Sequence, residues 1–162
     1  MPRIGLGYDS HRFVAGRPLM LGGVLVAHDM GLAGHSDADA ALHAITDAIL
    51  GALGLGDIGE HFPDGDPKWR NADSRHFVLH AVQLAHQHGM KVGNCDLTII
   101  TESPKLRAAK PLMKASIAEM LGVPQSAVAV KAKTNEHMGW IGRGEGLAAM
   151  AVVMLVEQTE IG

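Results

Sequence analysis

The order of hydrophobic and polar positions divides the chain into short strands and one-sided helices. The pattern over residues 3–13 predicts a first strand. The apolar runs 19–21 and 24–27 flank Gly22-Gly23, and this arrangement predicts a hairpin. Further apolar runs predict strands at 92–101, 128–132 and 147–156. The chain therefore carries several strands, and no internal repeat is visible.

Three other segments have the apolar spacing of helices. The first runs from Ser36 or Asp37, either of which can cap it, to about Leu53. The others cover about 73–89 and 108–121. The apolar stripe of the first helix consists of Leu42, Ile45, Ile49 and Leu53. The same helix also carries a polar row at a spacing of four residues, so these polar side chains share one face.

Two connections lack either periodicity. Residues 54–73 are rich in Gly, Asp and Pro, and residues 134–146 are irregular and rich in glycine. A connection as long as the first is usually functional in a small domain. Because strands and helices are mixed without a linker, we expect an α+β fold. We expect a single-domain two-layer α/β sandwich over residues 1–162, with a mixed β-sheet and helices on one face.

Composition narrows the class of protein. A chain of 162 residues that is 47% hydrophobic and 19% charged is expected to form one domain with its own core. No apolar run is long enough for a bilayer, no signal peptide is visible, and Cys95 is the only cysteine, which together indicate a cytoplasmic protein. The net charge of −3 argues against a nucleic-acid surface, while an anionic small molecule remains compatible with it.

A possible metal centre is the strongest chemical signal. Asp9 and His11 lie two residues apart on the first predicted strand, so their side chains point the same way. His43 on the first helix would complete a set of three protein ligands, which is typical of a catalytic zinc site with an open position. Asp47, one turn further on, would orient His43 as a hydrogen-bond partner. The alternative is an exposed aspartate and two histidines that are satisfied elsewhere.

Two weaker patterns favour ordinary roles. His76 and His80 are four residues apart on the second helix and would also fit a metal, but solvent exposure is the simpler interpretation. The segment Gly142-Arg-Gly-Glu-Gly146 lacks the spacing of a phosphate loop and precedes no predicted helix.

Taken in order, the motifs resemble one family, the 2-C-methyl-D-erythritol 2,4-cyclodiphosphate synthases of non-mevalonate isoprenoid synthesis. The resemblance covers nearly the whole chain. The motifs that carry it are Gly7-Tyr-Asp-Ser-His11, Gly34-His-Ser-Asp-Ala-Asp-Ala-Ala-Leu-His43, Leu55-Gly-Asp-Ile-Gly59, Phe62-Pro-Asp64, Ala72-Asp-Ser74, Pro104-Lys105, Lys131-Ala-Lys-Thr-Asn-Glu136 and Gly142-Arg-Gly-Glu-Gly146.

The resemblance implies a homotrimer with active sites between neighbouring subunits. It implies conversion of 4-diphosphocytidyl-2-C-methyl-D-erythritol 2-phosphate, a cytidine diphosphate compound, to the cyclic diphosphate and CMP. It also implies Zn²⁺ at Asp9, His11 and His43, and Mg²⁺ or Mn²⁺ at Glu136. The catalytic residues that it implies for transition-state stabilisation are His35 and Thr134.

The resemblance further implies a set of substrate contacts. They are Ser36, Asp57, Ile58, Gly59, Phe62, Pro63, Asp64, Gly65, Asp66, Thr101, Glu102, Ser103, Pro104, Lys105, Leu106, Arg107, Lys133, Asn135, Trp140 and Arg143. The last two also match positions that line a cavity on the trimer axis, where an isoprenoid diphosphate is a possible ligand.

The reaction implied by the resemblance needs no protein nucleophile, because the 2-phosphate of the substrate attacks its own β-phosphorus. Positioning and charge neutralisation would then supply the catalysis, and well-oriented intramolecular attack is worth roughly 7–11 kcal/mol. Two other functions stay open at this level. One is a metal-dependent phosphohydrolase of the helical kind with His-Asp pairs, and the other is a trimeric ligand-binding module with structural zinc.

Overall fold

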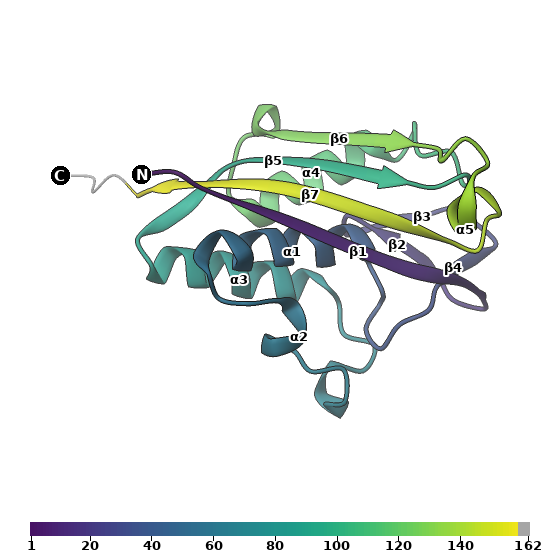
Figure 1. Cartoon of the computed structure of the whole chain (residues 1–162), viewed down its shortest axis with the longest axis horizontal. Coiled ribbons are helices and arrows are strands. Elements are labelled where there is room, and N and C mark those ends of the chain that lie inside the picture. Colours follow the sequence, from purple (N-terminus) through teal and green to yellow (C-terminus); the bar gives the residue numbers. More distant parts are fainter. Residues whose placement is uncertain (159–162) are drawn as a thin grey trace.

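Within residues 1–158, the part of the chain that the computed structural model describes, five strands form one mixed sheet in the order β4-β1-β7-β5-β6 (Figure 1). They are β1 (Arg3–Ala15), β4 (Met30–Leu32), β5 (Met90–Ile100), β6 (Val128–Lys133) and β7 (Gly146–Glu157). Strands β5 and β6 are parallel and the other pairs are antiparallel, which confirms the predicted mixed sheet. The last four residues of the predicted domain, 1–162, lie outside the described residues.

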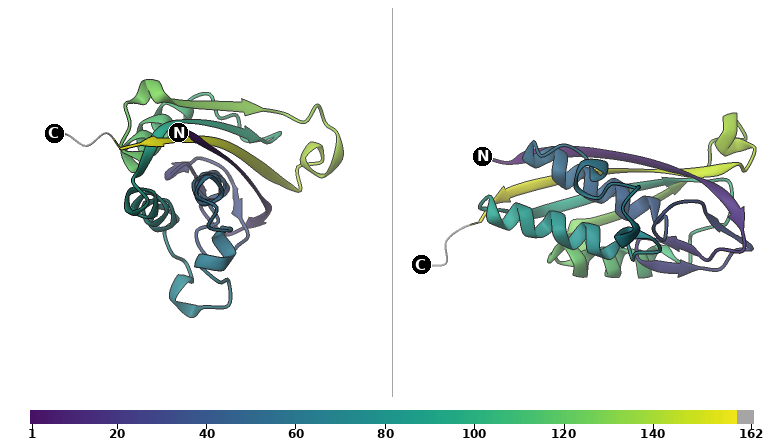
Figure 2. Two further views of the ribbon diagram at one scale, coloured as in Figure 1. Left: turned by 60° about the vertical axis from the view of Figure 1, so that its left-hand side comes forward. Right: turned by 90° about the horizontal axis from the view of Figure 1, so that it is seen from below.

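The helices cover one face of this sheet (Figure 2). They are α1 (Ala40–Leu53), α3 (Arg75–Gln87) and α4 (Lys110–Leu121). The predicted α+β sandwich with helices on one face is therefore confirmed. The core lies between the layers, and the apolar stripe predicted for α1 is buried. None of the helices in residues 1–158 combines the length and the apolar content required to cross a bilayer.

The structure corrects the predicted start of α1. Ser36 and Asp37 were expected to cap this helix, but the cap is Asp39, whose carboxylate accepts from the amide of Leu42. The same carboxylate accepts from the amides of Gly22 and Gly23 in the turn of the hairpin. Asp39 therefore joins a local cap to a distant turn, and this second role decides where the helix begins.

Short elements occupy segments that were expected to be irregular. The hairpin of β2 (Leu19–Leu21) and β3 (Val24–Val26) is present as predicted, and the edge strand β4, for which no strand was predicted, follows it. The long connection 54–73 contains α2 and η1, and the segment 134–146 contains α5. The bounds of the remaining elements are α2 (Ile58–His61), η1 (Pro67–Trp69), η2 (Gln125–Ala127) and α5 (Gly139–Gly142).

Helix α1 lies directly on β1 because two inward-facing positions of the strand are glycines. A Cβ atom on Gly5 would lie 1.8 Å from the carbonyl oxygen of Ala48, and one on Gly7 would lie 1.8 Å from that of Ala44. No side chain fits at that separation, so glycine is required for this close approach. The contact brings the helical turn of His43 over the strand positions that follow Gly7.

The opposite face of the sheet carries an apolar patch that no helix of the described chain covers. Leu6 pairs with Val152 and Tyr8 pairs with Met150 across β1 and β7, and all four side chains are exposed. Ile4 continues the row on β1. Exposed apolar positions in a contiguous group of this kind mark an interaction surface.

Candidate metal centre

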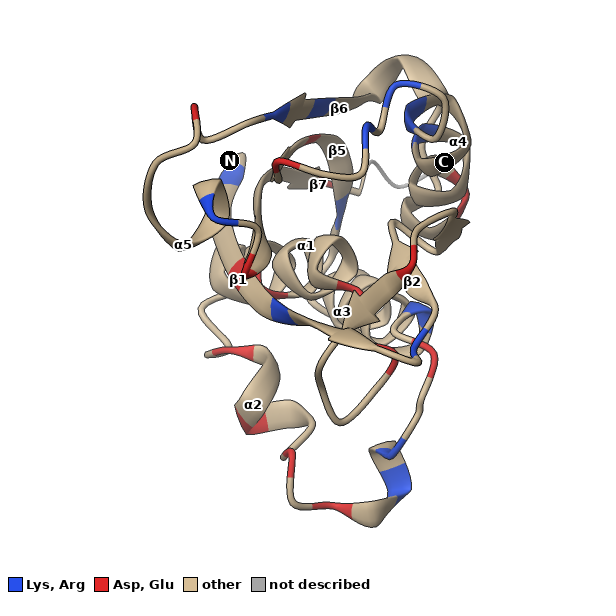
Figure 3. Cartoon of the chain, turned by 90° about the vertical axis from the view of Figure 1, so that its right-hand side faces the viewer, with Lys and Arg blue, Asp and Glu red and all other residues tan. Residues whose placement is uncertain are grey.

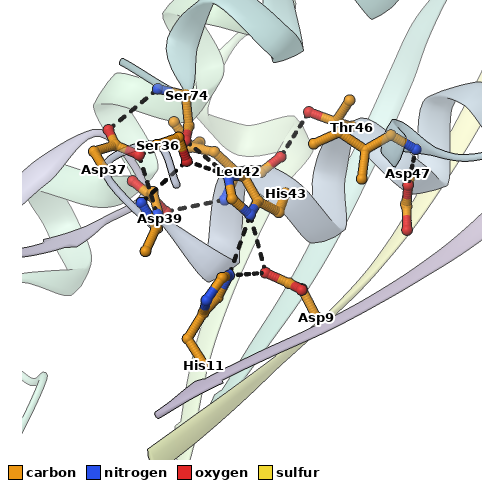
Figure 4. Close-up of polar contacts among 12 residues, drawn as sticks. Asp9, His11, Ser36, Asp37, Asp39, Leu42, His43, Thr46, Asp47 and Ser74 are labelled. Carbon is orange, nitrogen blue, oxygen red and sulfur yellow. Dashed lines mark hydrogen bonds and ion pairs between the residues drawn. The ribbon is translucent and has the colours of Figure 1, made fainter. Parts of the chain in front are cut away.

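Three side chains from two elements meet where β1 passes beneath α1. Asp9 and His11 come from β1 and His43 comes from α1, as the sequence predicted (Figure 4). The Asp9 Oδ2 atom lies 2.8 Å from His11 Nε2 and 3.1 Å from His43 Nδ1, and the two ring nitrogens are 3.3 Å apart. Donors bound tetrahedrally at zinc distances lie ~3.3 Å from one another, so the triangle has almost the size that zinc requires.

The orientation of His11 is fixed by a backbone carbonyl. His11 Nδ1 lies 2.6 Å from the oxygen of Ala33. A carbonyl oxygen only accepts, so Nδ1 carries the proton and Nε2 is left as the nitrogen that faces Asp9 and His43. A histidine held this way is already in the tautomer that a metal needs.

The charges of the cluster are coupled. Burial alone would raise the pKa of Asp9, but hydrogen bonds and charge from His11 and His43 outweigh it and hold the pKa below 3.8. Burial alone would lower the pKa of His11, but Asp9 and the carbonyl of Ala33 raise it above 6.5. Each of these two shifts favours the charged form of its group, and a divalent cation would compete with the proton of His11.

A pocket of about 190 Å³ opens next to these three residues. Predicted substrate contacts form much of its wall, and Trp69 and Phe77 add aromatic surface that the sequence did not indicate as functional. The predicted residues in the pocket are Asp9, His11, His35, Ser36, His43, Ile58, Gly59, Phe62 and Asp64. His35 is held at its rim because Nε2 donates to the backbone oxygen of Asp66 over 3.1 Å.

A second group of predicted residues lines a separate pocket of about 310 Å³. Its predicted members are Thr101, Pro104, Lys105, Leu106, Arg107, Lys133 and Thr134. Figure 3 shows Lys and Arg on β6 and α4 at this side of the molecule and mostly Asp and Glu on α2. The register aligns Asp9, Ala149, Ile99 and Ala132 across the sheet. The metal cluster and the end of β6 are thus three strand spacings apart, roughly 14 Å. His35 and Thr134 line different pockets of the chain.

The loop after β6 is organised by Glu102. The Oε1 atom of this largely buried carboxylate accepts from the amides of Asn135 and His137, each over 3.0 Å. Glu136 lies between them with a φ of 51°, a left-handed conformation that is rare outside glycine. Glu102 thus fixes the backbone of the loop on both sides of Glu136, whose side chain is exposed.

Several predicted contacts line neither pocket in this chain. Trp140 borders a third pocket of about 640 Å³ together with Arg12 and Glu145, and Arg143 lies beside it with an ion pair of 3.1 Å to Glu145. Asp57 and Asp66 cap short helical turns through their carboxylates. The other members of this group are Pro63, Gly65, Glu102, Ser103 and Asn135.

Asp47 does not take the role predicted for it. Its Oδ1 atom accepts from the amide of Ile58 over 2.7 Å and so fastens α2 to α1. Burial is the main reason that the pKa of Asp47 is raised. The Nε2 atom of His43 instead faces two hydroxyl groups, Ser74 Oγ at 2.8 Å and Ser36 Oγ at 3.2 Å. The sequence placed Ser74 only at a helix start and within a family motif, and that motif is the signal that could have marked it.

The fold and the site define an α+β protein with three side chains that could hold a metal ion, beside a pocket of about 190 Å³. Residues 2–156 match the model of the YgbB family, and the chain belongs to this family.

Named proteins and a solved structure are similar to this chain. The 2-C-methyl-D-erythritol 2,4-cyclodiphosphate synthase of Geobacter sulfurreducens is 55% identical over 156 residues, which cover 96% of this chain and 99% of that protein. The bifunctional enzyme IspD/IspF of Erythrobacter litoralis is 52% identical, and the chain spans only 40% of its length. A solved 2C-methyl-D-erythritol-2,4-cyclodiphosphate synthase in its CDP-bound form has a TM-score of 0.88 at 41% identity and covers 95% of this chain and 100% of that one.

Proposed function

We propose that this chain converts 4-diphosphocytidyl-2-C-methyl-D-erythritol 2-phosphate to 2-C-methyl-D-erythritol 2,4-cyclodiphosphate and CMP in cytoplasmic isoprenoid synthesis. The observation that carries the proposal is the convergence of Asp9, His11 and His43 beside a pocket, in a chain that matches a named synthase over almost its whole length. CDP bound to a solved relative supports a cytidine nucleotide as part of the substrate.

Zinc fits the donor set of two imidazole nitrogens and one carboxylate oxygen. When bound, it supplies Lewis-acid neutralisation of a phosphate oxygen. The protein supplies the positions: His11 is fixed by the carbonyl of Ala33, and His35 at the rim offers a further donor to an anionic group. Trp69 and Phe77 keep one wall of the pocket apolar and limit the water that can compete with intramolecular attack.

A second cation, Mg²⁺ or Mn²⁺, is part of the proposal and would be held by Glu136. Its carboxylate is exposed on a loop whose backbone is fixed by Glu102. Within residues 1–158, Asp9, His11 and His43 are the only group of three or more possible ligands that lie close together. Glu136 therefore needs oxygens from the substrate to complete the coordination of a metal, as hard cations often do at phosphates.

We further propose a homotrimer in which the two pockets of neighbouring subunits form one active site. Two features support it. The metal cluster and the pocket of Lys105 and Thr134 lie on strands roughly 14 Å apart in one chain, and the two pockets share no residue. The exposed face that carries Leu6, Tyr8 and Val152 offers an apolar surface for contact between subunits.

An isoprenoid diphosphate in the axial cavity also stays part of the proposal. The pocket that contains Trp140 and Arg12 supports it, because it combines an aromatic wall with a cation. Adding such a diphosphate should raise the melting temperature of the trimer, and no change would count against this ligand.

The two alternative functions fit less well. A helical phosphohydrolase is excluded by the five-stranded sheet of residues 1–158. A structural zinc site would fill all four positions with protein ligands, commonly cysteines, whereas Cys95 is buried in β5 and its pKa is raised by burial to about 12.

The direct test of the activity is release of CMP from the proposed substrate by the purified chain. Wild-type protein should release one CMP per substrate consumed, and His43→Ala should lose both zinc and turnover. A zinc-loaded wild-type trimer that releases no CMP would favour a binding module instead.

A further inference from the structure

The two ring nitrogens of His43 face opposite surroundings (Figure 4). Nδ1 points to the metal cluster, 3.1 Å from Asp9 Oδ2. Nε2 points away from it, 2.8 Å from Ser74 Oγ. The tautomer of His43 therefore decides whether Nδ1 offers a lone pair to a metal or a proton to Asp9.

The hydroxyl proton of Ser74 is used in a hydrogen bond to Asp37. Ser74 Oγ donates to Oδ1 of Asp37, and the amide of Ser74 donates to Oδ2 of the same carboxylate over 3.1 Å. A hydroxyl has one proton, and a carboxylate only accepts. The oxygen of Ser74 is consequently left as an acceptor, and its neighbour His43 Nε2 must bring the proton.

We propose that Asp37 and Ser74 are positioning residues that hold His43 in the Nε2–H tautomer, so that Nδ1 is the nitrogen offered to the metal. The pair takes the part that the sequence had assigned to Asp47. The consequence for metal binding rests on the proposed metal site, while the tautomer itself does not.

The surroundings of the pair fit this role better than a purely structural one. Ser74 is completely buried at the start of α3, yet its side chain makes no capping hydrogen bond to that helix. Its hydroxyl instead joins α3 to the segment before α1, and the only other hydroxyl near Nε2 is Ser36 at 3.2 Å in the described chain. Ser36 accepts from the amide of Ala38 and keeps its own proton free.

Replacement of Ser74 should therefore reverse the preference. In Ser74→Ala the hydroxyl of Ser36 can donate to Nε2, and Nδ1–H can then donate to Asp9. The new tautomer blocks the nitrogen that faces the metal. Since Ser74 does not cap α3, the Ala variant keeps the helix start intact, and its folding can be verified by its thermal transition.

The matched control is Asp73→Ala at the neighbouring position. Asp73 Oδ1 accepts from the amide of Arg75 over 2.9 Å, so this variant loses a real contact at the same helix start. The exposed carboxylate of Asp73 makes no hydrogen bond to His43 among the described residues. A change seen in both variants would come from the helix start and would overturn the proposal.

The first measurement is zinc affinity of the whole chain by competition with a chelating indicator. Outer partners of metal-bound histidines are typically worth 10- to 100-fold in affinity, so Ser74→Ala should bind zinc about 10- to 100-fold more weakly, and Asp37→Ala should also weaken it. Asp73→Ala should match the wild type. Equal affinity of Ser74→Ala and wild type would overturn the effect on the metal.

The second measurement is nitrogen-15 NMR of the His43 ring in the metal-free protein, above the range in which histidines titrate. The wild type should show a protonated Nε2 and an unprotonated Nδ1, and Ser74→Ala should shift toward Nδ1–H. A wild type with Nδ1 protonated would overturn the proposal. This result stands even if the wild type binds no zinc, an outcome that would refute the proposed metal site instead.

Discussion

Gly7 and Ala44 are in such close contact that a Cβ atom on Gly7 would lie 1.8 Å from the Ala44 carbonyl oxygen. Gly7 precedes Asp9 by two residues on β1, and Ala44 follows His43 on α1. The contact that seats the helix on the sheet is therefore next to the one that brings the three metal donors together. Packing and site geometry depend on the same approach of backbone to backbone.

Gly7→Ala should damage stability and metal binding together. The added methyl group meets a backbone atom that has no rotamer to escape to, so α1 has to move away from β1. We expect a loss of about 3 kcal/mol in the free energy of unfolding, measured by urea denaturation of the metal-free protein. Zinc affinity should fall as well, because the distance between His43 and Asp9 would grow.

Gly51→Ala is the control on the same helix. Gly51 is exposed, and a Cβ atom there would meet nothing within 4 Å. Alanine should stabilise the helix by about 0.5–1 kcal/mol and leave zinc affinity unchanged. If Gly7→Ala behaved like Gly51→Ala, the close packing of α1 on β1 would be wrong.

Leu6→Glu should prevent trimer formation without unfolding the subunit. Leu6 lies on the uncovered face of the sheet and is 61% exposed in the single chain, so a charge there is harmless until another subunit covers it. Leu112 on α4 is also 61% exposed, which makes Leu112→Glu a matched control on the helical side. Light scattering should give a monomer for the first variant and a trimer for the second. Trimers in both would contradict the proposed interface.

Asp39→Asn should destabilise the fold by about 1–3 kcal/mol. The carboxylate accepts hydrogen bonds from three backbone amides, and in the variant one of these amides would face an NH₂ group. Burial raises the pKa of Asp39 to about 6 from 3.8. Because this pKa is raised, the contribution of Asp39 to the free energy of unfolding is complete below pH 3.8 and is lost as the pH rises through about 6. The deficit of the variant should therefore be larger at about pH 4.5 than at about pH 7.5.

Asp29→Asn serves as the control for this measurement, since Asp29 is exposed. It should change the free energy of unfolding very little at either pH. A deficit of Asp39→Asn that grew with rising pH would contradict this, because the hydrogen bonds to the carboxylate would then outweigh the penalty of its burial.

Zinc affinity should fall at mildly acidic pH. Histidine binds a metal only when its donor nitrogen is free of a proton, and the pKa of His11 is raised above 6.5 by Asp9 against the effect of burial. Once the pH is below that pKa, affinity should drop about tenfold per pH unit for this one proton. Asp9 stays ionised throughout, because its pKa is lowered. Competition titrations between about pH 8 and pH 5.5 check this, and a constant affinity would contradict the coupling.

Much of the fold was predictable because its elements follow the local pattern of apolar residues. The apolar run of β7 and the apolar stripe of α1 are readable from their own residues. The start of α1 was not, because Ser36, Asp37 and Asp39 are all competent caps and the choice depends on the amides of Gly22 and Gly23. The strand β4 was missed for a similar reason, since three residues form a strand only against the end of β1.

The site was predictable to the same extent. Asp9, His11 and His43 have residue types and spacings that point to a metal, and the structure brings them together. The partner of His43 was predicted one helical turn away, at Asp47, whereas it is Ser74, 31 residues along the chain. Spacing on one helix is visible in a sequence, but a hydrogen bond between two separate elements is set by the tertiary fold.

The most direct test of the proposed function is phosphorus NMR of the products formed from 4-diphosphocytidyl-2-C-methyl-D-erythritol 2-phosphate, before and after removal of metal. We expect CMP and a cyclic diphosphate, loss of both on chelation, and their return when zinc and magnesium are added together. CMP accompanied only by linear phosphates, or turnover that persists in fully metal-free protein, would contradict it.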